Sequence, residues 1–517
     1  MQQTDLILSP EEAFYEELFL KKAADSLGVD IQDITDWKIE RKSVDARKKQ
    51  ILINMRIALF FKGEKQEDIS QKYHYGDVSK KPSVVVVGTG PAGLFAALRL
   101  IELGLKPVVL ERGKNVHDRK RDIAALNTKH ILDENSNYCF GEGGAGTFSD
   151  GKLYTRSNKR GDISRILEIF NIHGADESIL YEARPHIGTD KLPKIISTMR
   201  QRILDSGGEI YFSSRMSDMI ISDGKVNAVV TSDGKEFSAS AVILATGHSA
   251  EDVYRLLMSK GVKLEPKGFA MGVRVEHPRE LINEIFYHGS SSEYLPTASY
   301  SLVTQVKDRG VYSFCMCPGG QIVPSATQKG YNLVNGMSAA ARRNYWSNSG
   351  IVVEIRPEDF PMFSPENPLC GLDYQQEVER LTFVNAGGTQ KAPAQRLTDF
   401  VKGRISGSLL ESSFVPGLVS SPVHFWLPEF ISSRLRDGFK DFDRKMKGFL
   451  SEEAMVLATE SRTSSPVRIV RDETTMNCIN LKNLFPCGEG AGYAGGIVSS
   501  AMDGEKAAEA VKKVLDL

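Results

Sequence analysis

Two glycine-rich turns that lie far apart in the chain have the residue types and spacing needed to hold a nucleotide. The first reads Gly88-Thr89-Gly90-Pro91-Ala92-Gly93 and follows the pattern G-x-G-x-x-G. In such a turn the first glycine permits a tight bend, the second lets the backbone approach a pyrophosphate, and the third lets a helix pack closely on a strand. The phosphates then lie at the helix N-terminus, where free N–H groups and the helix dipole favour negative charge. This turn is therefore predicted to bind a dinucleotide.

The segments around this turn predict the βαβ unit that such a motif requires. Val84–Val87 is a continuous β-branched run, which is typical of a parallel strand buried on both faces. A helix over residues 92–103 and a second strand over 107–111 follow. Glu111 ends the second strand, where its carboxylate can accept hydrogen bonds from adenosine ribose hydroxyls, and Arg112 lies beside it.

The second turn follows another short apolar strand near the C-terminal end of the sequence. Residues 483–490 read Asn-Leu-Phe-Pro-Cys-Gly-Glu-Gly, so this strand ends at Gly488 and Glu489. Further glycines lead into a helix that we expect over residues 497–515. A third strand, over residues 241–245, ends in Thr246-Gly247. The carboxyl ends of parallel strands meet at one edge of a sheet, where ligands of open α/β folds bind.

Together these three strand ends resemble the glutathione-reductase-like FAD-binding superfamily, over most of residues 83–517. The resemblance implies FAD as cofactor, with Glu489 holding its ribityl chain and Met216 near its adenine. Many members have Asp at this position, and the longer Glu489 leaves the detail of that hydrogen bond open. Disulfide reductases of this superfamily carry a C-x4-C pair after the second strand, where this chain has only Cys139, so that subtype is disfavoured.

A glycine-dense loop over residues 138–153 adds a second contact surface, because its glycines permit unusual backbone angles and expose N–H groups. With segments 245–250, 462–468 and 488–497, this loop resembles a bacterial family of FAD-dependent dehydrogenases or NAD(P)/FAD-dependent oxidoreductases, and the match extends over the whole chain. The residues expected to contact FAD are Gly88, Thr89, Gly90, Pro91, Ala92, Gly93, Glu111, Arg112, Gly143, Gly144, Ala145, Gly146, Thr147, Met216, Ala245, Thr246, Gly247, His248, Gly488, Glu489, Gly495, Gly496 and Ile497.

We expect hydride transfer at the flavin N5 atom, with the helix that begins near Ile497 aimed at the N1–C2=O edge of the ring. The sequence identifies no catalytic residue. The candidates are Cys139, Lys152, Arg274 and His277. Packing, capping or phosphate contact is the favoured interpretation of the last three, and Cys139 can approach the flavin but has no resolving partner. Arg462 and Arg468 flank a Ser/Thr-rich turn where they can bind an anionic group of a substrate.

Composition excludes several other classes of protein. The 517 residues have a formal net charge of -1, which gives no support for nucleic acid as a partner. The six cysteines, including the C-x-C pair Cys315 and Cys317, lack the spacing of a disulfide framework or a zinc site, so we interpret them as free thiols and expect no metal. No signal peptide and no membrane-spanning run is present, which predicts a cytoplasmic location.

These patterns predict an α/β protein, α+β overall, with a Rossmann-like FAD-binding domain that carries a β-meander. A small α+β module is expected over residues 1–80, and the FAD-binding domain over 81–260 and 456–517. A mixed substrate domain is expected to be inserted over 261–455. In the small module we expect strands over 34–41 and 51–61 and a helix from about Glu11 to Leu27.

Three functions remain open at this level. The leading one is an FAD-dependent oxidoreductase that acts on a small organic substrate, with an unknown external electron donor or acceptor. The second is a reductase or monooxygenase fed by transiently bound NADH or NADPH, because no second G-x-G-x-x-G follows a strand in this chain. The third is a flavin-binding redox sensor or interaction protein whose module 1–80 contacts RNA or a protein.

Overall fold

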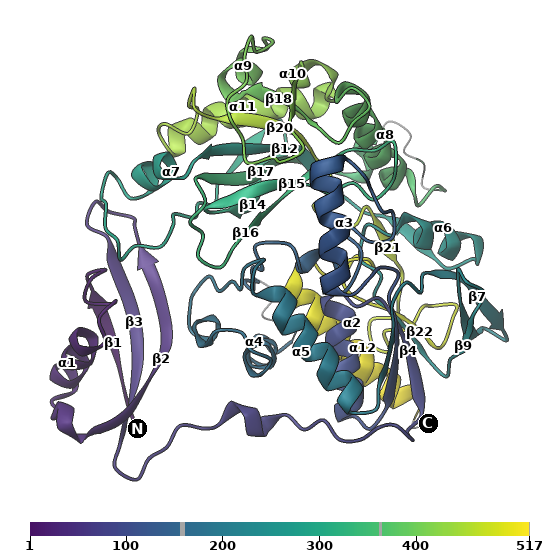
Figure 1. The fold of residues 1–517 in the computed structure, drawn as a ribbon, viewed down its shortest axis with the longest axis horizontal. Coiled ribbons are helices and arrows are strands. Elements are labelled where there is room, and N and C mark those ends of the chain that lie inside the picture. Colours follow the sequence, from purple (N-terminus) through teal and green to yellow (C-terminus); the bar gives the residue numbers. More distant parts are fainter. Residues whose placement is uncertain (156–160, 361–363, 365, 516–517) are drawn as a thin grey trace.

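A parallel sheet forms the centre of the nucleotide-binding half of the molecule (Figure 1). The computed structural model describes residues 1–155, 161–360, 364 and 366–515. The strands of the sheet lie in the order β22-β10-β4-β5-β6, and each neighbouring pair is parallel. They are β22 (Leu484–Pro486), β10 (Val242–Leu244), β4 (Ser83–Val87), β5 (Lys106–Leu110) and β6 (Glu209–Tyr211). The expected Rossmann-like α/β fold is confirmed.

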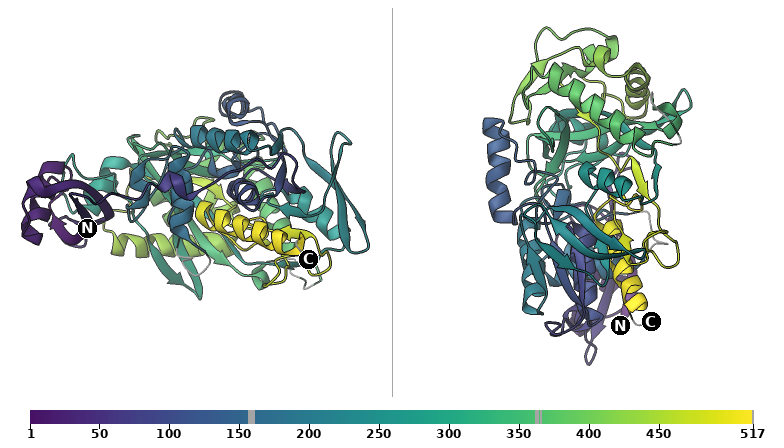
Figure 2. Two further views of the ribbon diagram at one scale, coloured as in Figure 1. Left: turned by 90° about the horizontal axis from the view of Figure 1, so that it is seen from below. Right: turned by 90° about the vertical axis from the view of Figure 1, so that its right-hand side faces the viewer.

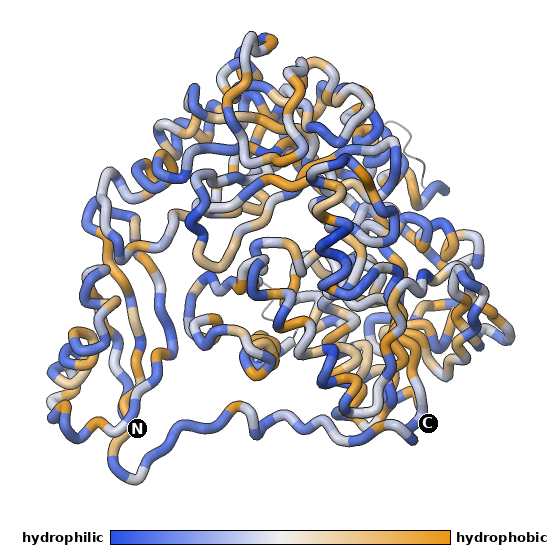
Figure 3. The backbone as a smooth tube through the Cα atoms, viewed as in Figure 1, coloured by the Kyte–Doolittle hydropathy of each residue, from blue (hydrophilic) through white to orange (hydrophobic). Residues whose placement is uncertain are grey.

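Both faces of this sheet are covered, which explains why its strands are apolar throughout. Val84 and Val86 of β4 pack in one cluster with α2 (Pro91–Glu102), α5 (Leu192–Asp205) and α12 (Ile497–Leu515). Val85 and Val87 pack against the antiparallel meander of β7 (Met216–Ser222), β8 (Lys225–Thr231) and β9 (Glu236–Ser238). The hydrophobic colouring of the parallel strands in Figure 3 follows from this burial on two sides.

A second, mostly antiparallel sheet lies beyond the carboxyl ends of the parallel strands. Its order is β13-β14-β17-β12-β20-β18-β19. These strands are Val303–Val306, Arg309–Cys317, Trp346–Ile355, Phe269–Pro278, Met455–Glu460, Ala392–Arg396 and Leu418–Ser420, respectively. Helices α7 (Arg279–Phe286), α9 (Leu397–Lys402), α10 (Val423–Trp426) and α11 (Glu429–Lys445) share its main apolar core (Figures 1 and 2). The hairpin of β15 (Gly320–Pro324) and β16 (Val334–Ser338) contacts β14 and β17 from the side of the first sheet.

The first residues form a small module at the left of Figure 1, joined to the rest by an extended segment over residues 62–82. Its antiparallel sheet has the order β1-β3-β2, formed by Gln2–Leu8, Leu52–Phe61 and Ile34–Asp45. Helix α1 begins at Glu16, later than the sequence suggested, because Ser9 and Glu12 close a preceding turn with reciprocal backbone-to-side-chain hydrogen bonds. The remaining helices are α3 (Val116–Lys129), α4 (Ile163–Ile172), α6 (Glu251–Ser259) and α8 (Cys370–Asn385). Among the described residues, no helix combines the length and apolar character that crossing a bilayer requires.

Candidate functional site

The carboxyl ends of the parallel strands open into a cavity of about 430 Å³, within the usual size range of small-molecule sites. Its walls come from segments that are far apart in the sequence. They include the residues after β4 (Gly88–Ala92), after β5 (Glu111 and Arg112), after β10 (Ala245–Ala250) and after β22 (Cys487–Glu489). In open α/β sheets, this edge is where ligands bind.

The glycines of the first turn have the separate roles that their spacing indicates. Gly88 has a φ of +105°, and a Cβ atom there would lie 2.4 Å from the carbonyl oxygen of Ala245. A Cβ atom on Gly93 would lie 1.9 Å from the carbonyl oxygen of Gly88, so Gly93 permits the contact between α2 and the turn. Gly90 faces the cavity, and Gly93 does not line it.

The glycine-dense loop brings the starts of α2 and α12 together. Gly144 has a φ of +64°, and its Cβ position lies 3.1 Å from the Cα atom of Gly90. The Cβ position of Gly146 lies 3.4 Å from Cγ1 of Ile497, the first residue of α12. Two helix N-termini therefore meet at the cavity, where their dipoles favour bound negative charge.

Gly143 and Thr147 of the same loop do not line the cavity. The Cβ position of Gly143 lies 2.4 Å from Cδ1 of Ile196, so this glycine faces the protein core. The Thr147 hydroxyl is buried and donates to the carbonyl oxygen of Glu142 at 2.9 Å. Both residues shape the loop, and neither is placed for the direct contact expected from the sequence.

Arg119 of α3 holds the glycine-dense loop in place, a role that no local pattern indicated. Its guanidinium is fully buried and donates to the carbonyl oxygens of Asn137 at 2.7 Å, Glu142 at 2.8 Å and Tyr138 at 2.9 Å. Burial lowers the pKa of Arg119 to about 10, which still leaves it charged at neutral pH. Its sequence neighbours Asp118 and Lys120 are charged, so the local sequence gives no sign that this arginine is buried.

The carboxylate of Glu111 is already saturated by donors from the protein. Its Oε2 atom accepts from the backbone N–H and the hydroxyl of Thr89 at 3.0 and 2.6 Å. Its Oε1 atom accepts from the N–H groups of Gly113 and Gly141 at 2.8 and 3.1 Å. Each carboxylate oxygen has two lone pairs. The expected bond to a ribose hydroxyl therefore requires one of these protein donors to move, and in this structure Glu111 fixes the turn and the loop.

Glu489 and His248 form a half-buried polar pair on the cavity wall. Their Oε2 and Nε2 atoms lie 3.5 Å apart. Burial raises the pKa of Glu489 to about 7, while burial and the nearby charge of Arg462 lower the pKa of His248 to about 4. The imidazole is therefore neutral at pH 7, and the carboxyl group titrates there. Carboxyl groups tuned in this way are suited to proton transfer.

Two polar atoms at the cavity have no hydrogen-bond partner among the described residues. These are Nδ1 of His248 and Nε of Arg112, and both are buried. Buried polar atoms are rarely left without a partner. The guanidinium of Arg112 is otherwise held by Asp252, with Nη1 to Oδ1 at 3.0 Å, and it lies 4.0 Å from the centre of the Phe140 ring. These two nitrogen atoms are therefore placed to hydrogen-bond a polar ligand in the cavity.

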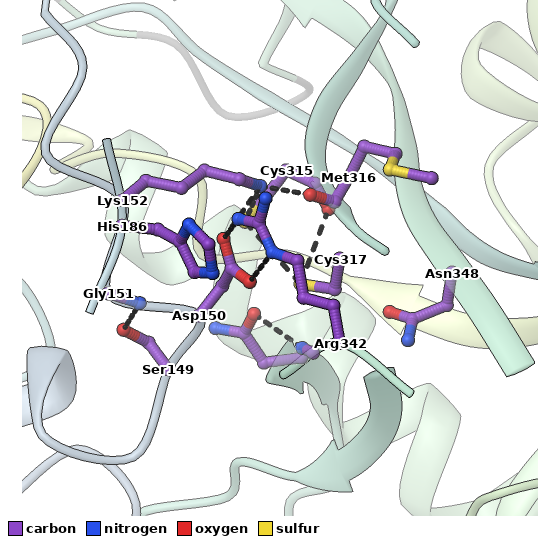
Figure 4. A network of polar contacts seen from close by, with 12 residues as sticks. Ser149, Asp150, Gly151, Lys152, His186, Cys315, Met316, Cys317, Arg342 and Asn348 are labelled. Carbon is purple, nitrogen blue, oxygen red and sulfur yellow. Dashed lines mark hydrogen bonds and ion pairs between the residues drawn. The ribbon is translucent and has the colours of Figure 1, made fainter. Parts of the chain in front are cut away.

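Of the candidates for catalysis, Cys139 and Lys152 line the cavity. The Cys139 sulfur lies 3.5 Å from the hydroxyl oxygen of Ser325. The Nζ atom of Lys152 donates to the carbonyl oxygen of Met316 and lies 3.6 Å from the sulfur of Cys315 (Figure 4). Cys315 also lines the cavity, although it was not among the residues expected there.

Arg274 and His277 do not line the cavity, which corrects their place among the catalytic candidates. Both belong to β12 and are fully buried. Arg274 donates to both carboxylate oxygens of Glu460, at 2.7 and 3.0 Å, and this ion pair raises the pKa of the guanidinium. His277 bonds the carbonyl oxygen of Phe449 at 2.8 Å, and burial lowers its pKa to about 4. Their polar atoms form hydrogen bonds within the part of the molecule that contains the second sheet.

The two arginines considered for an anionic substrate differ in position. Arg462 lines the cavity, but Glu379 accepts from its Nε and Nη2 atoms at 2.9 and 2.7 Å and offsets its charge. Arg468 lies on β21 (Val467–Ile469), is exposed, and does not line the cavity. The other expected contacts that do line it are Thr89, Pro91, Ala92, Ala145, Met216, Ala245, Thr246, Gly247, Gly488, Gly495 and Gly496.

Comparison with known families matches separate parts of the chain. Residues 268–463 match the model of an FAD-dependent protein, C-terminal domain-like, and residues 83–118 match an FAD binding domain. Residues 1–60 match a domain of unknown function. The second of these matches covers β4, the first glycine turn, α2 and Glu111.

Relatives extend the comparison to the full length. An uncharacterised protein of Clostridium beijerinckii is 40% identical over 518 residues, which covers 96% of this chain and 96% of that protein. Protein FixC of Escherichia coli K12 is 26% identical over 209 residues, which covers 39% of this chain and 45% of FixC. Among solved structures, the flavin-dependent brominase Bmp2 is 13% identical, with a TM-score of 0.36 over 84% of this chain and 79% of the brominase.

Proposed function

The chain belongs to the same family as the Clostridium relative and matches FAD-dependent family models, and we propose that it is an oxidoreductase that transfers a hydride between a small organic substrate and N5 of the flavin. The matches to FAD-dependent families confirm the expected cofactor. The observation that carries the proposal is the convergence on one cavity of Gly90, Gly144, Glu489 and Ile497, which lie on distant segments.

The residues present fit this cofactor. Gly90 and the start of α2 suit the pyrophosphate, because the backbone is uncovered there and the helix dipole favours anions. The unpartnered Nδ1 of His248 and Nε of Arg112 offer polar contacts, and no Cβ would meet an atom within 4 Å at Gly495 or Gly496. When bound, FAD supplies two-electron chemistry, while the protein sets orientation, electrostatics and access.

The start of α12 is proposed to stabilise negative charge on the reduced cofactor. A helix N-terminus contributes about 0.3–1 kcal/mol toward a nearby anion, and more where the site is buried. Ile497 is half-buried at the cavity and touches the loop at Gly146. Glu489, whose pKa lies near 7, holds a proton that it can exchange at its carboxyl oxygen with a group in the cavity, and neutral His248 supports it.

The substrate is proposed to be a small organic molecule, with an external electron donor or acceptor. FAD content and anaerobic reduction test the proposal directly. Protein purified from flavin-replete cells should be yellow, and stepwise reduction at pH 7 should give the anionic reduced flavin. A colourless protein that takes up no FAD on reconstitution overturns the proposal, and a neutral reduced flavin overturns the role of α12.

The identity of the electron donor needs a separate measurement. We propose an organic reductant or a protein partner as the leading possibility, with NADH or NADPH as the alternative. Anaerobic mixing with each nicotinamide, followed by flavin absorbance, separates them. Rapid bleaching identifies a nicotinamide-fed reductase or monooxygenase, and an unchanged spectrum with both favours another donor.

A further inference from the structure

Two cysteine thiols of β14 face each other beside the cavity (Figure 4). The sulfur atoms of Cys315 and Cys317 lie 4.0 Å apart. Cys315 is half-buried and lines the cavity, whereas Cys317 is fully buried behind it. The cavity therefore has a dithiol in one wall and the glycine turns of the nucleotide site in others.

A bulge in β14 lies next to the two cysteines and changes which side chains face the cavity. Ser313 pairs with Ile351 and Met316 pairs with Ser349, so β14 has one residue more than its partner between these two points. Neighbouring residues of a regular strand point to opposite faces, yet Phe314 and Cys315 both line the cavity. Bulges re-aim side chains in this way and are frequent beside active sites.

Two cations lie against the sulfur atoms. Nζ of Lys152 is 3.6 Å from the sulfur of Cys315, and Nη1 of Arg274 is 3.8 Å from the sulfur of Cys317. The hydrogen bond from Cys317, together with the charges of Lys152 and Arg274, holds the pKa of Cys315 well below its ordinary value. The thiolate is the reactive form of cysteine. Lys152, which the sequence could not assign, is here a positioning residue for that thiolate.

We propose that Cys315 and Cys317 form a reversible disulfide that exchanges two electrons with the flavin, which makes them a second redox centre of this protein. This inference rests on the proposed function, because it requires FAD in the adjoining cavity. As the S–S bond forms, the S–H bond of Cys317 breaks. The two electrons and that proton pass to the oxidised flavin, which becomes the anionic reduced form. The reverse step restores the Cys315 thiolate and the Cys317 thiol.

The distance between the sulfur atoms suits such a switch. A disulfide bond is about 2.0 Å long, so the two sulfurs must approach each other by about 2 Å from the 4.0 Å seen in the reduced structure. Cys139 lines the same cavity, and the sulfur contacts it makes are to Ser325 and not to another cysteine. Cys139 is therefore the matched control, a thiol that faces the cavity with no second cysteine in contact with it among the described residues.

Electron counting tests the inference. FAD-loaded protein is oxidised with diamide, freed of reagent, and titrated anaerobically with dithionite while flavin absorbance is recorded. We expect four electrons per FAD for the wild type and for Cys139→Ser. For Cys315→Ser and Cys317→Ser we expect two. Equal FAD content and equal thermal unfolding of the four proteins establish that the serine variants are folded.

Mass spectrometry supplies a readout that does not depend on flavin chemistry. Cleavage after Arg309 and Lys329 releases a peptide that contains Cys315 and Cys317 and no other cysteine. From diamide-oxidised wild type, this peptide should resist alkylation and be lighter by two hydrogen atoms. After reduction by photoreduced flavin in the same protein, it should carry two alkyl groups.

The outcomes separate this inference from the proposed function. A yellow wild type that takes up two electrons, with the peptide alkylated twice after oxidation, overturns the dithiol centre and leaves the flavoenzyme proposal standing. A protein that binds no FAD overturns the flavoenzyme proposal. It overturns this inference as well, because a disulfide found in that protein by mass spectrometry has no flavin with which to exchange electrons.

Discussion

Replacing Arg119 with methionine should loosen the glycine-dense loop and weaken FAD binding. The guanidinium donates to three buried backbone carbonyls, those of Asn137, Tyr138 and Glu142. The Glu142 carbonyl keeps the Thr147 hydroxyl as a donor, whereas methionine leaves the carbonyls of Asn137 and Tyr138 without a donor among the described residues. Each buried polar group left without a partner costs about 1–3 kcal/mol, so the free energy of unfolding should fall by at least about 2 kcal/mol.

The same change should raise the Kd for FAD, because this loop leads to Gly144 and Gly146 at the cavity. A tenfold rise in Kd corresponds to about 1.4 kcal/mol, and we expect at least that much. Urea unfolding followed by circular dichroism gives the stability, and reconstitution of the apoprotein followed by flavin fluorescence gives the affinity.

Arg121→Met is the matched control on the same helix. Its side chain is 86% exposed and lies 3.5 Å from Asp118, so its loss should cost no more than about 1 kcal/mol. If Arg119→Met and Arg121→Met unfold at the same urea concentration and bind FAD equally well, Arg119 does not hold the loop, and the explanation given for its burial is wrong.

Three other changes follow from the same geometry. Burial raises the pKa of Glu489 to about 7 from an ordinary value of 4.5, so the apoprotein should lose stability as the pH rises from 4.5 to 7. Urea unfolding at several pH values should show a smaller loss for Glu489→Gln, and an unchanged pH profile would contradict the raised pKa of this carboxyl group. Gly93→Ala places a Cβ atom 1.9 Å from a backbone oxygen, so it should lower the free energy of unfolding by about 1–3 kcal/mol or more and abolish FAD binding. Gly407→Ala, whose Cβ has no atom within 4 Å, is the control, and equal thermal unfolding of the two variants would refute the predicted clash at Gly93. His277→Gln should keep the rate of flavin reduction, since the ring bonds the Phe449 carbonyl away from the cavity; a large rate loss in stopped-flow reduction would show that His277 has a role that its position does not suggest.

Much of the fold followed from local patterns. The continuous apolar run Val84–Val87 predicts a strand covered on both faces, and the helices and the meander do cover it. The β-meander was also expected, and Asp223 and Gly224, which form the turn of its first hairpin between β7 and β8, both have a positive φ. These signals are readable because backbone conformation and burial impose a period and a residue type on neighbouring positions.

The hydrogen-bond and ion-pair partners of buried polar side chains could not be predicted from local patterns. Arg274 was a candidate for catalysis, yet it pairs with Glu460 across the second sheet, and Glu111 is saturated by Thr89 and two glycine N–H groups. Each of these contacts joins elements whose approach depends on how whole sheets and helices pack. A side chain's type states what it can bond, but only the packed neighbours decide what it does bond.

Local sequence patterns are enough to predict the dinucleotide turn, the Rossmann-like sheet and the carboxylate at the end of the last strand. The role of Arg119 in holding the glycine-dense loop, and the meeting of Cys315 and Cys317 at the cavity wall, follow only from the packed fold. This difference arises from the range of the forces involved. Backbone preferences act over a few residues, whereas burial and ion pairing join side chains that the chain brings together only after its sheets have packed.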